Sequence, residues 1–113
     1  RNFSLAQKKN KLIFQLRTSK TDRHGQTEME LLTLDDSGPT HLVLTYRSGE
    51  FHLYVDGERR EAPELKGDFF NWDEAHQVLI GNEVNGRYSW QGTLHSFAIL
   101  KRFLTEEQAL ARF

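Results

Sequence analysis

The sequence predicts an all-β fold, an antiparallel β-sandwich with a short helix at its C-terminal end. Three observations predict it: apolar and polar residues alternate over short segments, Gly-containing turns separate these segments at intervals of about 8–12 residues, and a helical pattern enters only near the end. The most informative segment is HLVLTYRSGEFHLYVDGE, residues 41–58, in which Asp56-Gly57 follows an alternating strand. A type I′ hairpin turn needs positive φ at both central residues, and Asp-Gly is a pair that supplies it. This segment therefore predicts successive hairpins.

The strand pattern is also clear in residues 11–18, KLIFQLRT, where Leu12, Phe14 and Leu16 recur at every second position. Such alternation is typical of a strand with one buried face. Clusters of turn residues such as DDSGP at 35–39 separate the segments, and neither a βαβ unit nor an internal repeat is present. The predicted strands are residues 2–7, 11–18, 27–34, 40–46, 51–56, 58–62, 76–82 and 92–100.

The last segment changes from strand to helix. Residues 105–108, TEEQ, form a capping box, in which the Thr105 hydroxyl accepts from the backbone amide of Gln108 and the Gln108 side chain accepts from the amide of Thr105. Leu104 precedes the cap and Leu110 follows it within a helix-favouring stretch. One or two helical turns are therefore predicted to close the chain.

Length and composition exclude several classes of function. The 113 residues suffice for a single domain, residues 1–113, with a modest core. Lys and Arg number 15 against 16 Asp and Glu, so no basic field is available to bind nucleic acid. No apolar run approaches the roughly 20 residues that span a bilayer, so membrane insertion is not expected. The chain has no cysteine, which excludes disulfides, thiolate metal sites and cysteine nucleophiles.

An ordered set of segments resembles a known family. The segment at 41–58 is followed by NWDEAHQVLIGNE, SWQGTLHSFAIL and LTEEQ, and together these are similar to a laminin-G-like domain of the concanavalin A-like lectin and glucanase superfamily. The resemblance extends over the whole chain and is strongest after Thr40. It implies a jelly-roll β-sandwich, an extracellular or cell-envelope setting, and a place within a longer multidomain protein.

One departure from the family pattern concerns the start of the chain. Domains of this kind usually begin with further strands before the segment that resembles RNFSLAQ. The sequence is therefore expected to be either a fragment or a sandwich that lacks N-terminal strands. A reduced sandwich would expose a sheet edge or an apolar face, and such surfaces favour self-association.

Catalysis is not expected, although the resembled superfamily includes glucanases. Glycoside hydrolysis needs two carboxylates held across the scissile bond. Enzymes of the resembled superfamily place them on one strand face, in a pattern resembling Glu-x-Asp-x-x-Glu. No segment matches that pattern. Glu28 and Glu30 share a strand face, but a solvated face explains them. A strained G-x-S-x-G turn is also absent from the sequence, so we expect the chain not to be an enzyme.

A calcium site is one interpretation of the segment that follows residue 81. Asn82, Glu83 and Asn85 supply the amide and carboxylate oxygens that Ca²⁺ prefers, and similar folds coordinate calcium at a comparable strand end. The alternative is that Asn85-Gly86 is a turn and Glu83 a charge at a strand end. We favour the turn, and no other cofactor is implied.

The most plausible function is binding through loops. Loops at 19–26, 67–74 and 83–90 would be presented by a rigid sandwich, and their aromatic and polar side chains suit a carbohydrate or a protein partner. The alternative is a structural or interaction domain that docks other domains or subunits without a glycan ligand. The tryptophans also have a structural reading, as rings wedged against the sandwich. The candidate ligand-binding residues are Trp72, Arg87, Tyr88 and Trp90.

Overall fold

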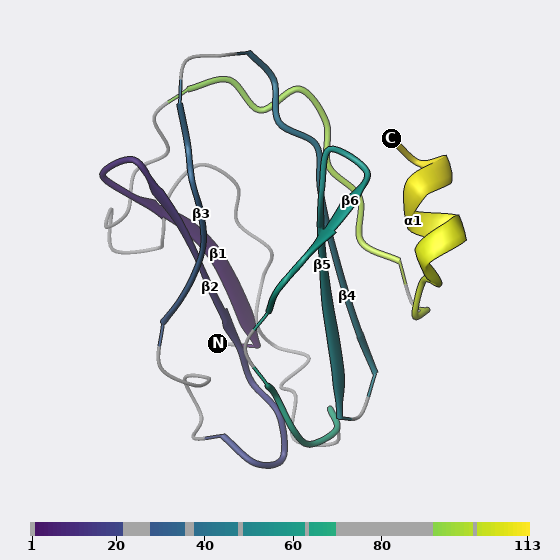
Figure 1. Ribbon diagram of the computed structural model, residues 1–113. Coiled ribbons are helices and arrows are strands. Elements are labelled where there is room, and N and C mark those ends of the chain that lie inside the picture. Colours follow the sequence, from purple (N-terminus) through teal and green to yellow (C-terminus); the bar gives the residue numbers. More distant parts are fainter. Residues whose placement is uncertain are drawn as a thin grey trace.

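Two antiparallel sheets face each other, and a helix lies beside the second (Figure 1). The computed structural model describes residues 2–21, 28–35, 38–47, 49–62, 64–69, 92–100 and 102–113. The predicted antiparallel β-sandwich with a short C-terminal helix is confirmed over these residues. The first sheet has the strand order β1 (Phe3–Lys8), β2 (Lys11–Leu16), β3 (Met29–Thr33). The second sheet has the order β4 (Leu42–Arg47), β5 (Glu50–Val55), β6 (Glu58–Arg60). The helix is α1 (Glu106–Ala111).

The Asp56-Gly57 hairpin predicted from the sequence is confirmed. Asp56 has φ 51° and Gly57 has φ 78°, so both central residues lie in the left-handed region that a type I′ turn needs. The register pairs Val55 with Glu58 directly across the turn. Gly57 has a second role, because a Cβ atom added there would lie 2.9 Å from Leu110 Cδ1. The turn is therefore also a docking point for the C-terminal segment.

The core lies between the two sheets. Alternation along β2 and β5 directs Phe14 and Phe51 toward each other, and their rings stack with centroids 5.6 Å apart and an interplanar angle of 21°. Leu16, Met29 and Leu65 complete the buried cluster. Burial of a side chain of this size contributes about 1.5–3 kcal/mol, so the contacts of this cluster are a substantial source of stability for the sandwich.

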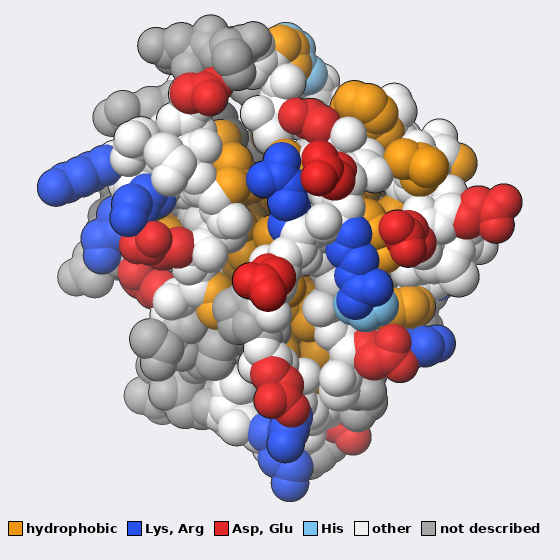
Figure 2. All heavy atoms as spheres, in the orientation of Figure 1, with side chains coloured by type: hydrophobic (Ala, Val, Ile, Leu, Met, Phe, Trp, Pro, Cys, Tyr) orange, Lys and Arg blue, Asp and Glu red, His pale blue; other side chains and the backbone are white. Residues whose placement is uncertain are grey.

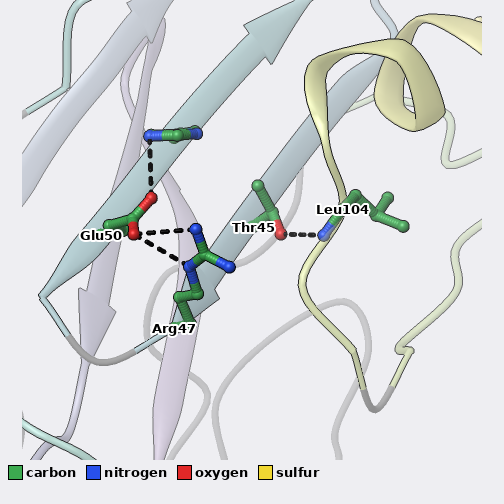
Figure 3. A network of polar contacts seen from close by, with 5 residues as sticks. Thr45, Arg47, Glu50 and Leu104 are labelled. Carbon is green, nitrogen blue, oxygen red and sulfur yellow. Dashed lines mark hydrogen bonds and ion pairs between the residues drawn. The ribbon is translucent and has the colours of Figure 1, made fainter.

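The other face of the β4–β5 hairpin is covered by the C-terminal segment, residues 102–113. The backbone amide of Leu104 donates a hydrogen bond of 2.7 Å to Oγ1 of Thr45 on β4 (Figure 3). Thr45 and Leu104 are each only 4% exposed, so neither group has access to water. An unsatisfied amide in this position would cost the free energy of its desolvation. The bond therefore fixes where the segment meets the sheet.

An aromatic contact extends this docking along the hairpin. Phe103 lies beneath the guanidinium group of Arg47, whose carbon is 4.3 Å from the ring centroid, and His52 meets the same ring edge-on with centroids 5.4 Å apart. Arg47 also donates from Nε and Nη2 to Oε1 of Glu50, each at 2.9 Å (Figure 3). Exposed ion pairs contribute little by themselves, so this one mainly orients the guanidinium over the ring.

The predicted capping box begins α1 as expected. Thr105 Oγ1 accepts from the amide of Gln108 at 3.2 Å, and Gln108 Oε1 accepts from the amide of Thr105 at 3.0 Å. The helix buries Ala109 completely. A helix this short is marginal alone, so its packing against the second sheet stabilises it.

The strand predicted over residues 92–100 is wrong. All nine residues are exposed and, among the described residues, they form no strand. Figure 1 shows the segment crossing from the upper end of the first sheet toward the second and then to α1, so it does not follow a strand edge where its amides would find partners. Its large apolar side chains are therefore left in solvent: Leu94 at 47%, Phe97 at 52%, Ile99 at 58% and Leu100 at 40% exposure.

Other differences from the predicted bounds are small. The second strand ends at Leu16 rather than at residue 18, because Thr18 begins a tight turn, and the third begins at Met29 rather than at residue 27. The predicted strand at 76–82 lies outside the described residues. Within the described part of the chain, α1 is too short to cross a bilayer, and no membrane-spanning helix is found.

The Thr45–Leu104 hydrogen bond can be tested by Thr45→Val, which keeps the shape of the side chain and removes its oxygen. The buried Leu104 amide then loses its acceptor, and we expect the free energy of unfolding to fall by about 1–3 kcal/mol. Urea unfolding would measure the change. Thr33→Val at an exposed position of β3 is the matched control, expected within about 0.5 kcal/mol of the parent. Equal losses in the two variants would contradict the assignment.

Candidate functional site

Two connections meet at one end of the sandwich, at the lower end of Figure 1. The backbone amide of Ser19, after β2, donates to the carbonyl of Asp68 at 2.8 Å, and the amide of Asp68 donates back to Ser19 Oγ at 3.0 Å. These reciprocal bonds join segments that are 49 residues apart in the sequence. We call this surface the loop end and define it by residues 18–21, 46 and 66–69.

Thr18 anchors the loop that follows β2. It is completely buried, and its hydroxyl donates to the carbonyl of Lys66 at 2.5 Å while accepting from the amide of Lys20 at 3.2 Å. Its own amide donates to Oγ1 of Thr21 at 2.9 Å, and that hydroxyl donates back to the Thr18 carbonyl at 3.1 Å. A buried polar group with its bonds satisfied favours one conformation over its alternatives. The loop is therefore held in a fixed turn.

Gly67 allows the two segments to approach this closely. Its φ is 103°, a conformation that side chains rarely adopt. A Cβ atom there would lie 2.6 Å from Thr18 Oγ1, 2.8 Å from Ser19 Oγ and 2.9 Å from the backbone nitrogen of Lys20. Only glycine fits both the backbone and the space.

Tyr46 supports the loop end from the second sheet. Its hydroxyl donates to the carbonyl of Gly67 at 2.5 Å and accepts from the amide of Gly49 at 3.5 Å. Burial raises the pKa of Tyr46, the bond from Gly49 opposes that change, and the nearby Asp68 carboxylate adds to it. The phenol therefore stays protonated at neutral pH and remains a hydrogen-bond donor. Its ring also contacts that of Phe69, with centroids 5.2 Å apart.

The loop end combines an aromatic surface with polar groups. Phe69 remains 37% exposed although it packs on Tyr46, and the exposed side chains of Asp68 and Lys20 lie on the same two segments. An aromatic face beside hydrogen-bonding groups is the chemistry of a site for sugars or for a protein partner. Among the described residues, no group of three or more His, Cys, Asp or Glu side chains that could hold a metal ion is found.

The structure describes only part of the surface predicted from the sequence. It brings together the described parts of the predicted loops at 19–26 and 67–74. Phe69 and Tyr46 were missed as members of the site. The sequence contains a signal for Phe69, because this residue follows Gly67 and Asp68 in a predicted loop. It contains none for Tyr46, because the contact of Tyr46 with Gly67 spans 21 residues. The predicted ligand residues Trp72, Arg87, Tyr88 and Trp90 and the predicted metal ligands Asn82, Glu83 and Asn85 lie outside the described residues.

Glu28 and Glu30 lie on the first sheet, with lysines as partners. Oε2 of Glu28 is 3.5 Å from Lys8 Nζ, and Oε2 of Glu30 is 3.1 Å from Lys11 Nζ. These four side chains border a shallow depression of about 330 Å³ with Ile13 in its wall. The two carboxylates are thus ion-paired along a charged sheet face.

The close approach at Gly67 can be tested by Gly67→Ala. The added methyl group meets both a left-handed backbone and three atoms of the neighbouring loop, so we expect a loss of about 2–4 kcal/mol in the free energy of unfolding. Gly49→Ala is the matched control, because Gly49 has φ 81° but open space around it. Its expected loss is about 1 kcal/mol, measured by the same denaturant titration. Similar losses for the two would show that the loops do not pack as closely as described.

Comparison with solved structures supports the sandwich. The chain is similar to the 2.1 Å crystal structure of an S-layer domain-containing protein, residues 221–444, from Clostridium thermocellum ATCC 27405, with a TM-score of 0.54 and 18% sequence identity. The match covers 90% of this chain and 51% of that one, so this chain spans about half the length of its structural neighbour. At this identity the likeness shows a shared fold and nothing beyond it.

Comparison of sequences identifies the family. No curated protein matches the chain. The family model Laminin_G_3, described as the concanavalin A-like lectin/glucanases superfamily, matches residues 1–109, which is almost the whole chain. The ordered strand segments, the two facing antiparallel sheets and the family match agree, and the chain therefore belongs to the laminin-G-like family of the concanavalin A-like lectin/glucanase superfamily.

Proposed function

We propose that this chain is a noncatalytic binding module that recognises a carbohydrate or a protein partner through loops at one end of its sandwich. Membership of the family supports the general class of function. The observation that carries the proposal is the pair of reciprocal hydrogen bonds between Ser19 and Asp68, which joins two loops into one surface.

Rigidity is the first reason why the loop end suits binding. A loop that must become ordered on binding loses conformational entropy, and preorganisation removes that cost. Thr18, Gly67 and Tyr46 already fix the positions of both segments through buried or half-buried contacts. A ligand would therefore meet a surface whose shape is set before it arrives.

The chemistry of the exposed groups is the second reason. The face of a sugar ring is apolar and packs on aromatic rings, while its hydroxyls need donors and acceptors. Phe69 offers a ring, Asp68 a carboxylate, and Lys20 an ammonium group on the adjoining loop. A protein partner could use the same mixture at a small interface. We extend the proposed site to the ligand residues predicted from sequence: Trp72, Arg87, Tyr88 and Trp90.

Setting and lack of catalysis are further parts of the proposal. Family membership favours a role outside the cell or in the cell envelope and a binding role rather than hydrolysis. The ion pairs of Glu28 and Glu30 with lysines favour a role in the charged surface over a catalytic pair. Hydrolysis of β-glucans by the purified chain would contradict this part.

A structural or interaction domain is the second candidate function. The exposed apolar side chains between residues 92 and 100 favour it, because soluble monomers rarely leave several large apolar groups together in solvent. In this alternative the chain would dock another domain or subunit through residues 92–100 and would have no glycan ligand. The loop end would then serve only to close the sandwich.

One pair of variants separates the two candidates. If the loop end binds, Phe69→Ala should weaken binding to ligands found on a glycan array about tenfold, which corresponds to about 1.4 kcal/mol, and Phe97→Ala should leave it unchanged. Both phenylalanines are partly exposed, at 37% and 52%, so the substitutions are matched in kind. Titration calorimetry would measure the affinity, and sedimentation velocity the oligomeric state.

Either of two results would contradict the loop-end proposal. One is a chain that binds no glycan and self-associates through residues 92–100, with Phe97→Ala restoring the monomer. The other is glycan binding that Phe69→Ala leaves intact while Phe97→Ala abolishes it. Trp72→Ala and Tyr88→Ala extend the same test to the proposed ligand residues.

For calcium, we expect the turn interpretation of Asn82, Glu83 and Asn85 to hold. Treatment with EDTA should leave the melting temperature unchanged, because a turn needs no ion. Differential scanning calorimetry with EDTA, and again after adding excess Ca²⁺, would measure this. A decrease of several degrees that Ca²⁺ reverses would instead show a calcium site, since a bound ion stabilises the folded state by mass action.

A further inference from the structure

In the described part of the chain, the second sheet ends at the strand β6. The three residues of β6, Glu58–Arg60, are all exposed, and their register pairs them with β5 on one side: Val55 with Glu58, Tyr54 with Arg59 and Leu53 with Arg60. On the other side of β6 the described residues provide no strand. The backbone groups of an edge strand can pair with an added strand, so this edge is a template for one.

A groove lies beside this edge. It has a volume of about 430 Å³ and is lined by Phe51, Arg59, Arg60, Glu61 and Ala62. Phe51 is only 8% exposed and belongs to the core cluster, and Ala62 packs against that cluster, so these two side chains give the groove an apolar floor. Figure 2 shows hydrophobic side chains between basic and acidic ones in the middle of the view, where β6 crosses in Figure 1.

The two arginines give the edge a preference for carboxylates. Among the described residues, no glutamate or aspartate is found within 4.0 Å of the charged group of Arg59 or Arg60. Several other basic side chains do have a glutamate within that distance: Lys8, Lys11, Arg47 and Lys66. A guanidinium group presents a planar set of donors that matches a carboxylate. Arg59 and Arg60 are adjacent on a strand, so they project to opposite faces of the sheet. A partner strand would meet both with two consecutive acidic residues.

Charge also argues against a second copy of this chain as the partner. Antiparallel pairing of two β6 edges centred between Arg59 and Arg60 would place Arg59 opposite Arg60 and Glu58 opposite Glu61. Centring on Arg59 or on Arg60 would place that arginine opposite itself, although the residues on either side would then pair an arginine with a glutamate. Like charges directly opposite each other destabilise a strand pair. Each of these three registers therefore contains at least one pair of like charges, whereas a strand with acidic residues opposite both arginines contains none.

The register specifies what that sequence needs. β6 ends at Arg60, and continuing its register by two residues would place Ala62 opposite Phe51, on the face of the sheet that holds the apolar floor. An added antiparallel strand would therefore place an apolar residue opposite Ala62 and a basic residue opposite Glu61. It would place acidic residues opposite Arg60 and Arg59. Read along the partner, this order is apolar, basic, acidic, acidic.

We propose that the β6 edge and its groove bind an extended acidic peptide segment of another protein, which adds to the second sheet as a strand. Its two carboxylates pair with Arg59 and Arg60, and its apolar side chain enters the groove over Phe51 and Ala62. The residues that line this groove are not those that define the loop end, so the inference does not rest on the proposed function.

The test uses the intact chain and a fluorescent ten-residue peptide with Val-Lys-Glu-Glu at its centre and Thr and Ser around it. Fluorescence anisotropy measures affinity, and hydrogen exchange measures protection of the amides at 58–62. The comparison variant is Arg59→Glu with Arg60→Glu. Its matched control is Arg102→Glu with Arg112→Glu, which makes the same change in charge at two exposed positions. Arg59→Gln with Arg60→Gln serves if the reversed pair unfolds.

We expect the peptide to bind to the parent chain. The double substitution at Arg59 and Arg60 should weaken its affinity at least tenfold, and the control substitutions at Arg102 and Arg112 should change it less than twofold. Binding should also slow exchange at 58–62, and a peptide with both glutamates changed to lysine, or with an N-methylated backbone, should not bind. The proposal would be overturned if the parent peptide does not bind, or if the two pairs of substitutions weaken binding equally. It would also be overturned if the N-methylated peptide binds equally well, or if binding does not slow exchange at 58–62. A polyuronate that binds at Arg59 and Arg60 without slowing exchange at 58–62 would show that the edge takes an acidic glycan instead, and would also overturn it.

Discussion

The stacking of Phe14 on Phe51 is the contact on which the other features of this domain depend. It holds the two sheets face to face and fixes which side of β5 points inward. Because the register pairs Tyr46 with Phe51, the same contact also turns Tyr46 inward, where its hydroxyl reaches the carbonyl of Gly67. The geometry of the loop end therefore follows from the packing of the core, and Phe51 also forms the floor of the groove beside β6.

The second sheet is covered on both faces. Its inner face packs on the first sheet, and its outer face receives Phe103 and Leu104 of the C-terminal segment. Tyr54 of β5 shows what this covering implies, since the residue is 1% exposed and its hydroxyl has no hydrogen-bond partner among the described residues. Burial raises the pKa of Tyr54, with the nearby charge of Arg59 opposing this and that of Glu106 adding to it. The phenol is thus kept neutral beneath the helix.

Local signals in the sequence predicted the fold well. Asp56-Gly57 and the capping box at Thr105 are short-range patterns whose bonds lie within a few residues, and both are confirmed. Alternation failed at residues 92–100, because it reports that a segment can form a strand and not that a neighbouring strand is available. The hydrogen bonds of the loop end could not be predicted from the sequence for a similar reason, because Ser19 and Asp68 meet only once the two sheets have packed. The family was recognisable because it depends on the order of many weak segments rather than on one contact.

Gly57 is constrained both by the hairpin turn in which it lies and by the C-terminal helix that packs on it. As a turn residue it needs only a positive φ, which asparagine also tolerates. The side chain of Leu110 removes that freedom, because any Cβ atom at 57 would press against it. The hairpin turn and the C-terminal helix are therefore coupled at this position. A relative with a larger residue at the position of Gly57 would have to turn the side chain at position 110 aside, carry a smaller residue there, or hold its C-terminal helix elsewhere.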